Sequence, residues 1–282
     1  MEILRSKAQV ENYVERNREY GKKIGFAPTM GALHQGHLSL YEYAKKENDL
    51  VLSSIYVNPT QFNNQQDLEK YPRNVERDLE MLKKSGFVDA VYLPVTEELY
   101  PQGLKAEEYE FDGLENEMEG QFRPGHFNGV GTVVERLFEH VKPDHAYFGE
   151  KDYQQLAIIR KMAEKKNLPV KISGVPTLRE ESGLAMSSRN ERLSAKQREN
   201  AAIIHETLVK VNDWFRIITI PEINKRVSEI FEKQPGMVLQ YFKIADEETL
   251  RETDFFYVDR SYRAFIAVFA GDVRLIDNMH LD

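Results

Sequence analysis

Two histidines, His34 and His37, stand three residues apart with Gly36 between them. The apolar run 24–27 before them is typical of a strand that Pro28 ends, and the pattern from about His37 onward is helical. A helix N-terminus that follows a strand and a glycine-containing loop presents unpaired N–H groups and the positive end of the helix dipole. Imidazole N–H groups at such a place can stabilise charge that develops on a transferring phosphoryl group. The spacing therefore predicts phosphate chemistry.

The histidine pair has two simpler interpretations, which the residues alone leave open. A structural Zn²⁺ site has four protein ligands, and His34 and His37 supply two of them. The chain has no cysteine, and no further ligands stand near the pair in the sequence. The other interpretation is that both are ordinary surface or capping side chains. The placement of Gly31 and Gly36, with the strand–loop–helix context, favours phosphate chemistry over both alternatives.

Two neutral amides follow the next apolar run. Residues 49–57 are rich in β-branched and apolar side chains, which predicts a buried strand. Asn58 and Gln61 come directly after it, at the carboxyl end where parallel sheets bind ligands. Amides can hydrogen-bond hydroxyls and carboxylates without adding charge, although a polar turn would use the same residues. The segment 63–67 has the composition of a loop and is a candidate lid.

A second strand-to-helix loop stands at Gly149–Asp152, after the apolar run 144–148. Lys151 is placed to meet a phosphate as a point charge. Asp152 can cap the following helix or help to hold Mg²⁺ around a nucleotide. The alternative is a surface turn without a ligand.

Residues 183–190 combine two hydroxyl groups with a guanidinium group. Ser187, Ser188 and Arg189 together can clamp a phosphate. A helix cap is the plainer interpretation, because a long helix is predicted over 193–215.

The order of the elements predicts two domains. Strands and helices alternate as far as a strand at 170–175, which predicts a parallel βαβ sheet of the α/β class. Farther along, this alternation is lost and strands are predicted at 237–244, 262–269 and 273–278. We therefore expect an α/β domain over 1–184 and a smaller α+β domain over 185–282.

Composition excludes several classes of protein. The chain has 282 residues and a net charge of −8, from 38 basic and 46 acidic residues, which argues against nucleic acid as a partner. No apolar run approaches the roughly 20 residues that span a bilayer, so we expect no membrane partner. The N-terminus lacks the apolar core of a signal peptide, and we expect a cytoplasmic protein.

Five motifs occur in order along the chain, and together they are far more specific than the four-residue His-x-Gly-His match to the nucleotidyltransferase superfamily. The motifs are PTMGALHQGH (28–37), NPTQF (58–62), RPGHF (123–127), YFGEKDYQQ (147–155) and GLAMSSRN (183–190). The set resembles the pantothenate synthetase family, with specific motifs from 28 to 190 and a weaker likeness beyond.

The resemblance implies a Rossmann-like N-terminal domain and a smaller C-terminal domain, usually in a homodimer. It implies a ligase that joins pantoate to β-alanine with ATP and Mg²⁺ and releases AMP and pyrophosphate. A pantoyl-adenylate is the implied intermediate.

The resemblance also assigns roles to individual residues. His37 matches the proton donor, and His34 and Lys151 complete the catalytic set. Gln61 and Gln155 match glutamines that contact pantoate, Gln61 also lies at the implied β-alanine site, and Asp152 is the expected Mg²⁺ ligand. The implied ATP-binding residues are Met30, Gly31, Ala32, Leu33, His34, Gln35, Gly36, His37, Gly149, Glu150, Lys151, Asp152, Leu178, Met186, Ser187, Ser188 and Arg189.

Three other functions compete with this interpretation. A nucleotidyltransferase that acts on a phosphorylated alcohol would keep the His-x-Gly-His loop, but the paired glutamines suit an uncharged polyol acid better than a second phosphate. A class I tRNA synthetase would need an anticodon-binding module, for which the chain offers no evident segment. A non-catalytic nucleotide-binding protein would not need the intact set of histidines, lysine and Ser-Ser-Arg.

Overall fold

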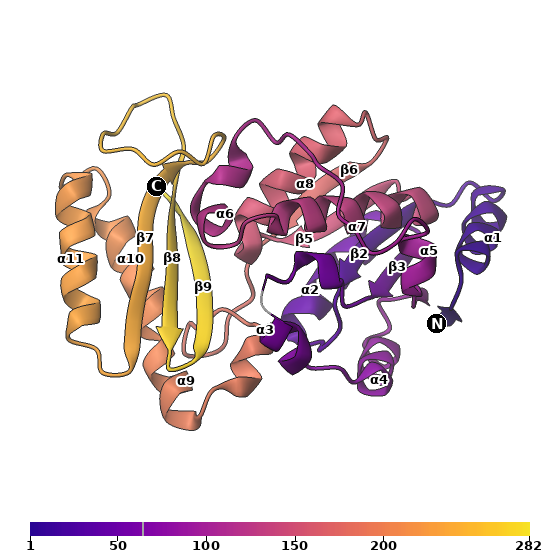
Figure 1. The fold of residues 1–282 in the computed structure, drawn as a ribbon, viewed down its shortest axis with the longest axis horizontal. Helices are drawn as coiled ribbons and strands as arrows, with labels where there is room; N and C mark the ends of the chain where they lie inside the picture. Colours follow the sequence, from indigo (N-terminus) through magenta and orange to yellow (C-terminus); the bar gives the residue numbers. More distant parts are fainter. Residues whose placement is uncertain (64) are drawn as a thin grey trace. The chain divides into compact units, whose positions relative to one another are not determined.

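The computed structural model describes residues 1–63 and 65–282, and these fold into two compact units (Figure 1). The first unit comprises Met1–Glu150 and Gln155–Pro176, and the second comprises Lys151–Gln154 and Thr177–Asp282. Apart from Lys151–Gln154, the second unit begins directly after the last strand of the first sheet. This point lies earlier than the expected boundary between 184 and 185. The expected boundary is placed where the alternation of strands and helices in the sequence is lost.

The first unit contains a parallel sheet of six strands in the order β1-β4-β3-β2-β5-β6. Long apolar runs form its central strands, because parallel strands are covered on both faces. Every residue of β3 is buried. The strands are β1 (Glu2–Leu4), β2 (Ile24–Thr29), β3 (Leu50–Ile55), β4 (Ala90–Tyr92), β5 (His145–Gly149) and β6 (Lys171–Val175).

Helices cover the faces of this sheet, and their bounds follow local capping signals. Ser6 caps α1, and Asn74 caps α4, which ends at Gly86 in the left-handed conformation. The α-helices are α1 (Lys7–Arg18), α2 (Gln35–Glu47), α3 (Gln65–Lys70), α4 (Val75–Ser85), α5 (Thr96–Leu99), α6 (Met118–Phe122), α7 (His126–Val141) and α8 (Tyr153–Lys165).

Helices α2 and α4 share one core with the sheet. Leu40 and Tyr41 of α2 and Leu82 of α4 pack with Val51 and Val91 from the strands. The connections β2–α2–β3 and β5–α8–β6 run in opposite directions across the sheet. Since parallel crossovers are right-handed, α2 and α8 lie on opposite faces. Helix α1 packs against α7, which contacts β2.

The prediction that Pro28 ends the first long strand is wrong. β2 continues to Thr29, with Pro28 opposite Ser54 of β3. On its other side β2 pairs with β5 only at Gly25 and Phe26. The far end of β2 therefore has one side without a ladder, where the missing N–H of a proline costs no hydrogen bond.

The prediction of a loop at 63–67 is wrong for its second half, because α3 begins at Gln65. Asn64 lies outside the described residues. The lid role of this segment stays a prediction.

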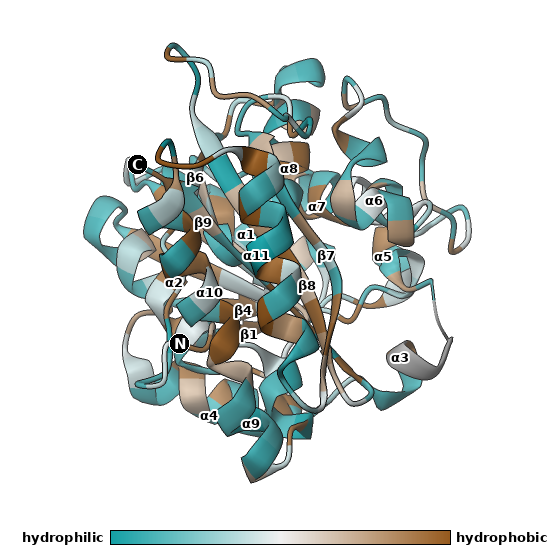
Figure 2. Ribbon diagram, turned by 90° about the vertical axis from the view of Figure 1, so that its left-hand side faces the viewer, coloured by the Kyte–Doolittle hydropathy of each residue, from teal (hydrophilic) through white to brown (hydrophobic). Residues whose placement is uncertain are grey.

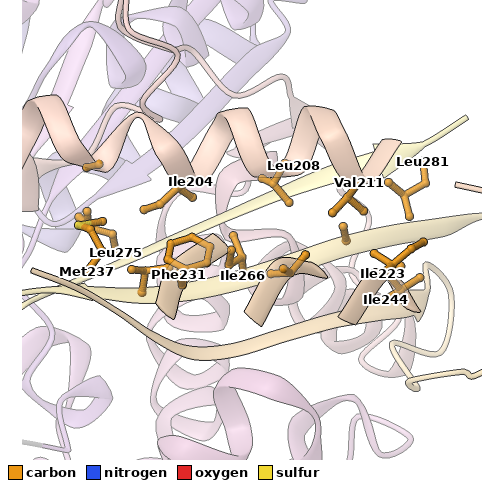
Figure 3. Packing of buried hydrophobic residues seen from close by; sticks show 14 of the residues in the cluster. Ile204, Leu208, Val211, Ile223, Phe231, Met237, Ile244, Ile266, Leu275 and Leu281 are labelled. Carbon is orange, nitrogen blue, oxygen red and sulfur yellow. The ribbon is translucent and has the colours of Figure 1, made fainter. Parts of the chain in front are cut away.

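The second unit combines an antiparallel sheet in the order β7-β8-β9 with helices on one face. Figure 3 shows Ile204, Leu208 and Val211 of α10 pointing toward buried side chains of the strands, including Ile266 and Leu281. The α-helices are α9 (Ala195–Ala201), α10 (Ile203–Trp214) and α11 (Ile220–Glu232), and the strands are β7 (Met237–Asp246), β8 (Tyr262–Ala270) and β9 (Val273–Leu281).

The prediction of a single long helix over 193–215 is wrong. Ser194 starts a helix with a capping box to Gln197, but α9 ends at Ala201 and α10 begins at Ile203. Hydrophilic and hydrophobic stretches alternate along α11, which fits a helix with one apolar face (Figure 2). Among residues 1–63 and 65–282, no helix is long and apolar enough to cross a membrane.

Candidate active site

The first candidate residues lie at the carboxyl edge of the parallel sheet. β2 and β5 are neighbours, and the chain leaves them toward opposite edges, to β3 and to β6. Such a reversal of strand order is where open α/β sheets bind ligands. The segment Met30–His37 follows β2, and Gly149 is the last residue of β5. The two motifs predicted to bind phosphate therefore start from adjacent strands.

His34 and His37 form the N-terminal cap of α2. The N–H of Gly36 donates to His34 Nδ1 at 3.1 Å, and the N–H of His34 donates to His37 Nδ1 at 3.3 Å. The ring centroids are 4.1 Å apart. An imidazole that accepts at Nδ1 carries its proton on Nε2 when it is neutral, so both rings present Nε2–H as a donor. The capping interpretation and the phosphate interpretation are thus compatible.

Asp78 of α4 holds the backbone of the segment before the histidines. Its two carboxylate oxygens accept the N–H groups of Ala32, at 2.9 Å, and Leu33, at 2.8 Å. Asp78 is 1% exposed, so these charge-assisted bonds form away from water. Gly31 has φ +79°, and a Cβ there would lie 2.8 Å from Asp78 Oδ2. Only glycine fits this close approach.

The side chain of Gln61 is oriented by a chain of hydrogen bonds. Asn58 Nδ2 donates to Gln61 Oε1 at 3.2 Å, and the Tyr100 hydroxyl donates to Asn58 Oδ1 at 2.6 Å. Burial raises the pKa of Tyr100, which keeps this hydroxyl protonated. Asn58 Nδ2 also donates to the Gly129 carbonyl at 3.0 Å, and because a carbonyl can only accept, this bond fixes which end of the Asn58 amide is nitrogen. Asn58 then orients Gln61. Gln61 Nε2 lies 2.8 Å from Met30 Sδ.

The backbone of Gln61 is held by the RPGHF motif. His126 Nδ1 lies 2.7 Å from the Gln61 carbonyl oxygen, and Arg123 Nη2 donates to the same oxygen at 3.3 Å. A side chain at Gly129 would lie 2.4 Å from the carbonyl oxygen of Thr60. The start of α7 therefore packs directly on the turn that carries Gln61, in keeping with the burial of Gln61.

The other predicted residues of the first unit differ in how far they are exposed. Leu33 is fully buried in the core, whereas Gln35 is exposed in the first turn of α2. Gln155 is half-buried near the start of α8, and Glu150 begins a 3₁₀ turn, Glu150–Asp152. The roles of these residues stay predictions.

In the second unit, Lys151 and Asp152 are adjacent in space as well as in sequence. Lys151 Nζ lies 3.7 Å from Asp152 Oδ2. The described residues include no group of three side chains that could hold a metal ion by themselves. A single exposed carboxylate fits an Mg²⁺ ion that arrives on nucleotide phosphates and keeps several waters, since Mg²⁺ in such sites takes one or two carboxylates.

Ser187, Ser188 and Arg189 follow a short hairpin. The N–H of Met186 donates to the Leu178 carbonyl at 3.0 Å, and Arg179 forms an antiparallel bridge with Ala185. Ser187 Oγ accepts the N–H of Arg189 at 3.3 Å and so caps the 3₁₀ helix Ser188–Arg192. The predicted cap of the helix that follows is wrong for these residues, because Ser194 caps α9 and Ser187 caps only the 3₁₀ helix. The hairpin also brings Leu178 and Met186 together, and their ATP-binding role stays a prediction.

Sequence reasoning missed the residues that position this site. The helical pattern of 74–84 gives no role to Asp78, although this residue stands four positions before the buried Leu82 and is itself buried. A carboxylate on the apolar side of a helix is the available signal. Tyr100 lies in a stretch without periodicity and gives no signal.

The fold and the residues at its sheet edge define a class, a Rossmann-like α/β chain with a His-x-Gly-His helix cap at the switch point. A model of the family described as pantoate-beta-alanine ligase matches residues 2–280. A pantothenate synthetase from Christiangramia forsetii is 50% identical over 282 residues, covering 100% of both chains. A pantothenate synthetase from Flavobacterium psychrophilum is 48% identical over 281 residues, covering 100% of both chains. The chain belongs to the pantoate-β-alanine ligase family.

Solved structures agree with this membership. Pantothenate synthetase from Thermus thermophilus matches with a TM-score of 0.90 and 40% identity over 99% of each chain. Pantoate-β-alanine ligase from Francisella tularensis, complexed with β-γ ATP and β-alanine, matches with a TM-score of 0.81 and 37% identity, over 99% of this chain and 97% of that one. The predicted family and the predicted fold class are confirmed.

Proposed function

We propose that this chain is a pantoate–β-alanine ligase, which forms the amide bond of pantothenate at the expense of ATP. The observation that carries the proposal is the family match over residues 2–280, together with intact site motifs. A relative at 37% identity was solved with β-γ ATP and β-alanine, two of the three expected substrates.

We infer that the first step is adenylation of pantoate. A carboxylate oxygen of pantoate attacks the α-phosphorus of ATP, the bond between the α-phosphorus and the bridging oxygen breaks, and pyrophosphate leaves. Negative charge develops on the phosphoryl oxygens and on the leaving group. Nε2–H groups of His34 and His37 stabilise it, because each ring uses Nδ1 within the helix cap.

The family resemblance also assigns phosphate contacts to cationic and hydroxyl groups of the second unit. Lys151 supplies a point charge, and Ser187, Ser188 and Arg189 supply donors to phosphate oxygens. Mg²⁺ bound to the ATP phosphates would neutralise part of their charge, with Asp152 as one protein ligand.

The second step transfers the acyl group to β-alanine. The neutral amine attacks the acyl carbon, the bond from that carbon to the phosphate oxygen breaks, and AMP leaves with an oxygen that belonged to pantoate. The amine loses a proton as the amide forms. Gln61 and Gln155 orient pantoate in both steps through its hydroxyls and carboxyl group, and Gln61 also contacts β-alanine.

Product analysis with single omissions tests the ligase proposal. The chain is incubated with ATP, Mg²⁺, pantoate and β-alanine, and each acid is left out in turn. AMP and pantothenate that accumulate only with both acids support the proposal. A nucleotide-linked product without AMP would instead indicate a nucleotidyltransferase.

Isotope transfer tests the adenylate. Pantoate labelled with ¹⁸O in its carboxylate should pass one label to AMP for each pantothenate formed. AMP without label would contradict attack by the carboxylate on the α-phosphorus.

We propose, from the family resemblance, that the enzyme works in the cytoplasm as a homodimer. Sedimentation equilibrium of the purified chain tests the dimer, and a single species at the 32.8 kDa mass of one chain would contradict it.

A further inference from the structure

Two adjacent residues of β9, Asp277 and Asn278, connect the C-terminal sheet to both nucleotide-binding segments of the second unit. They are 4% and 3% exposed. Neighbouring residues of a strand point to opposite faces, so the pair can hold two different segments at once. We propose that Asp277 and Asn278 are positioning residues that set the geometry of Lys151 and of the Ser187–Arg189 segment toward ATP. This inference rests on the proposed function.

Asn278 holds the backbone of Lys151. Its Nδ2 donates to the Lys151 carbonyl oxygen at 2.8 Å, and its Oδ1 accepts from Arg263 Nη1 at 2.7 Å. Arginine can only donate and a carbonyl can only accept, so the amide has one permitted orientation. Arg263 is itself fixed by Glu247, whose Oε1 lies 2.7 Å from Arg263 Nε.

The ring of Tyr153 adds a second attachment for the same segment. The Arg263 guanidinium lies 4.0 Å from the Tyr153 ring centroid, and the Tyr153 and Phe265 rings are 6.0 Å apart. The stretch Lys151–Gln154 therefore belongs to the second unit, although the residues on either side belong to the first. The C-terminal sheet thereby restrains the cation predicted to meet phosphate.

Asp277 holds the hairpin that leads to Ser187. Both of its oxygens pair with Arg179, at 2.6 and 3.1 Å, and one also accepts the Asn278 N–H at 2.8 Å. Arg179 Nη1 donates in turn to the Gly183 carbonyl at 3.1 Å. A bidentate pair with a carboxylate this deeply buried fixes both position and orientation. The consequence is that a rigid strand sets the spacing of two loops that are distant in sequence.

Substitution of Asn278 tests the first half of the proposal. Asn278→Asp keeps an acceptor for Arg263 and loses the donor to Lys151, and Asn278→Ala removes both. We expect ATP binding, measured by calorimetry with a β,γ-non-hydrolysable analogue, to weaken about three- to tenfold, while the KM for pantoate stays within about twofold. Arg274→Ala, on the same strand and face but bonded to Gln240, should bind the analogue like the wild type. Thermal melting verifies that each variant is folded.

A double-mutant cycle separates positioning from general damage. If Asn278 acts through Lys151, then Asn278→Asp in a Lys151→Ala background should change analogue affinity less than about twofold. Asp277→Asn should instead weaken analogue binding in the Lys151→Ala background as it does in the wild type. In an Arg189→Ala background it should no longer change analogue affinity. Equal effects of either substitution in all backgrounds would overturn the proposal.

The wild-type measurement distinguishes this inference from the function on which it rests. A wild type that binds the analogue, with a folded Asn278→Asp that binds it equally well, overturns the inference alone. A wild type without affinity for the analogue overturns the proposed function and the inference together.

Discussion

At the scale of single residues, the two ring nitrogens of His34 and of His37 have different roles. Each Nδ1 accepts a backbone N–H at the start of α2, and each Nε2 carries the proton. The cap fixes the ring orientation and the tautomer, which a flexible surface histidine would not have. The helix-capping role therefore orients both rings before any ligand binds.

Gln61 is expected to recognise pantoate more than ATP. Gln61→Ala should raise the KM for pantoate far more than the KM for ATP, because the amide is the group proposed to meet the pantoate hydroxyls and carboxyl group. Steady-state kinetics with each substrate varied measure both constants. Equal increases in the two constants would remove Gln61 from the pantoate site.

Tyr100 is expected to act through Asn58. Tyr100→Phe deletes the hydroxyl that donates to Asn58 Oδ1, so we expect the KM for pantoate to rise about three- to tenfold with the KM for ATP unchanged. Tyr109→Phe is the matched control, since its hydroxyl bonds Glu135 and neither Asn58 nor Gln61. A Tyr100→Phe enzyme with wild-type constants would show that Gln61 needs no such support.

At the scale of elements, α4 is joined through Asp78 to the segment that precedes the two histidines. Asp78→Asn leaves only one acceptor for the N–H groups of Ala32 and Leu33, so one buried donor loses its partner. We expect a loss of about 1–3 kcal/mol in the free energy of unfolding and a kcat at least about tenfold lower. Chemical denaturation and steady-state kinetics measure the two effects.

Asn74→Ala provides the control for this helix. It removes the N-cap of α4, which accepts the N–H of Arg77 at 3.0 Å, and should cost about 1 kcal/mol without a change in kcat. If both variants lowered kcat in proportion to stability, Asp78 would have no separate effect on the loop.

Strong local patterns make most elements predictable. The strand predicted at 170–175 spans Lys171–Val175 in the structure. The three predicted C-terminal strands lie close to their observed bounds. β1 escapes prediction because a strand of three residues has too little pattern, and the break at Ala202 escapes it because the apolar spacing continues through that position.

The candidate site is predictable only as far as its motifs. Residues in short contiguous segments, such as His34 and His37, carry local signals. Asp78, Tyr100 and Asn278 act through partners 45, 42 and 127 residues away in sequence, and no local pattern records such pairs. Tertiary contacts of this kind become visible only in the folded chain.

At the scale of the whole molecule, His140 should make stability depend on pH. Burial lowers its pKa from 6.5 to about 4, and the imidazole lies 3.0 Å from the Tyr92 hydroxyl. The unfolded chain therefore binds a proton between these pH values that the folded chain does not. Stability should fall as pH drops from 6.5 to about 4, by at most about 3 kcal/mol from this residue.

The His140→Gln variant isolates this effect. Chemical denaturation at about pH 7 and about pH 4.5 should show a smaller loss of stability on acidification for the variant than for the wild type. His145 and His205, whose pKa values are also lowered by burial, are present in both proteins and cancel in the comparison. An identical pH dependence in the two proteins would contradict the assignment.

The most direct test of the central claim is exchange of labelled pyrophosphate into ATP, with pantoate and Mg²⁺ present and β-alanine absent. A ligase that adenylates pantoate first must catalyse this exchange, and His37→Ala should lower its rate about a hundredfold or more, the scale of one lost transition-state donor. We expect exchange in the wild type that requires pantoate and is nearly lost in the variant. Exchange that needs no pantoate, or that proceeds at wild-type rate without the His37 imidazole, would contradict the account.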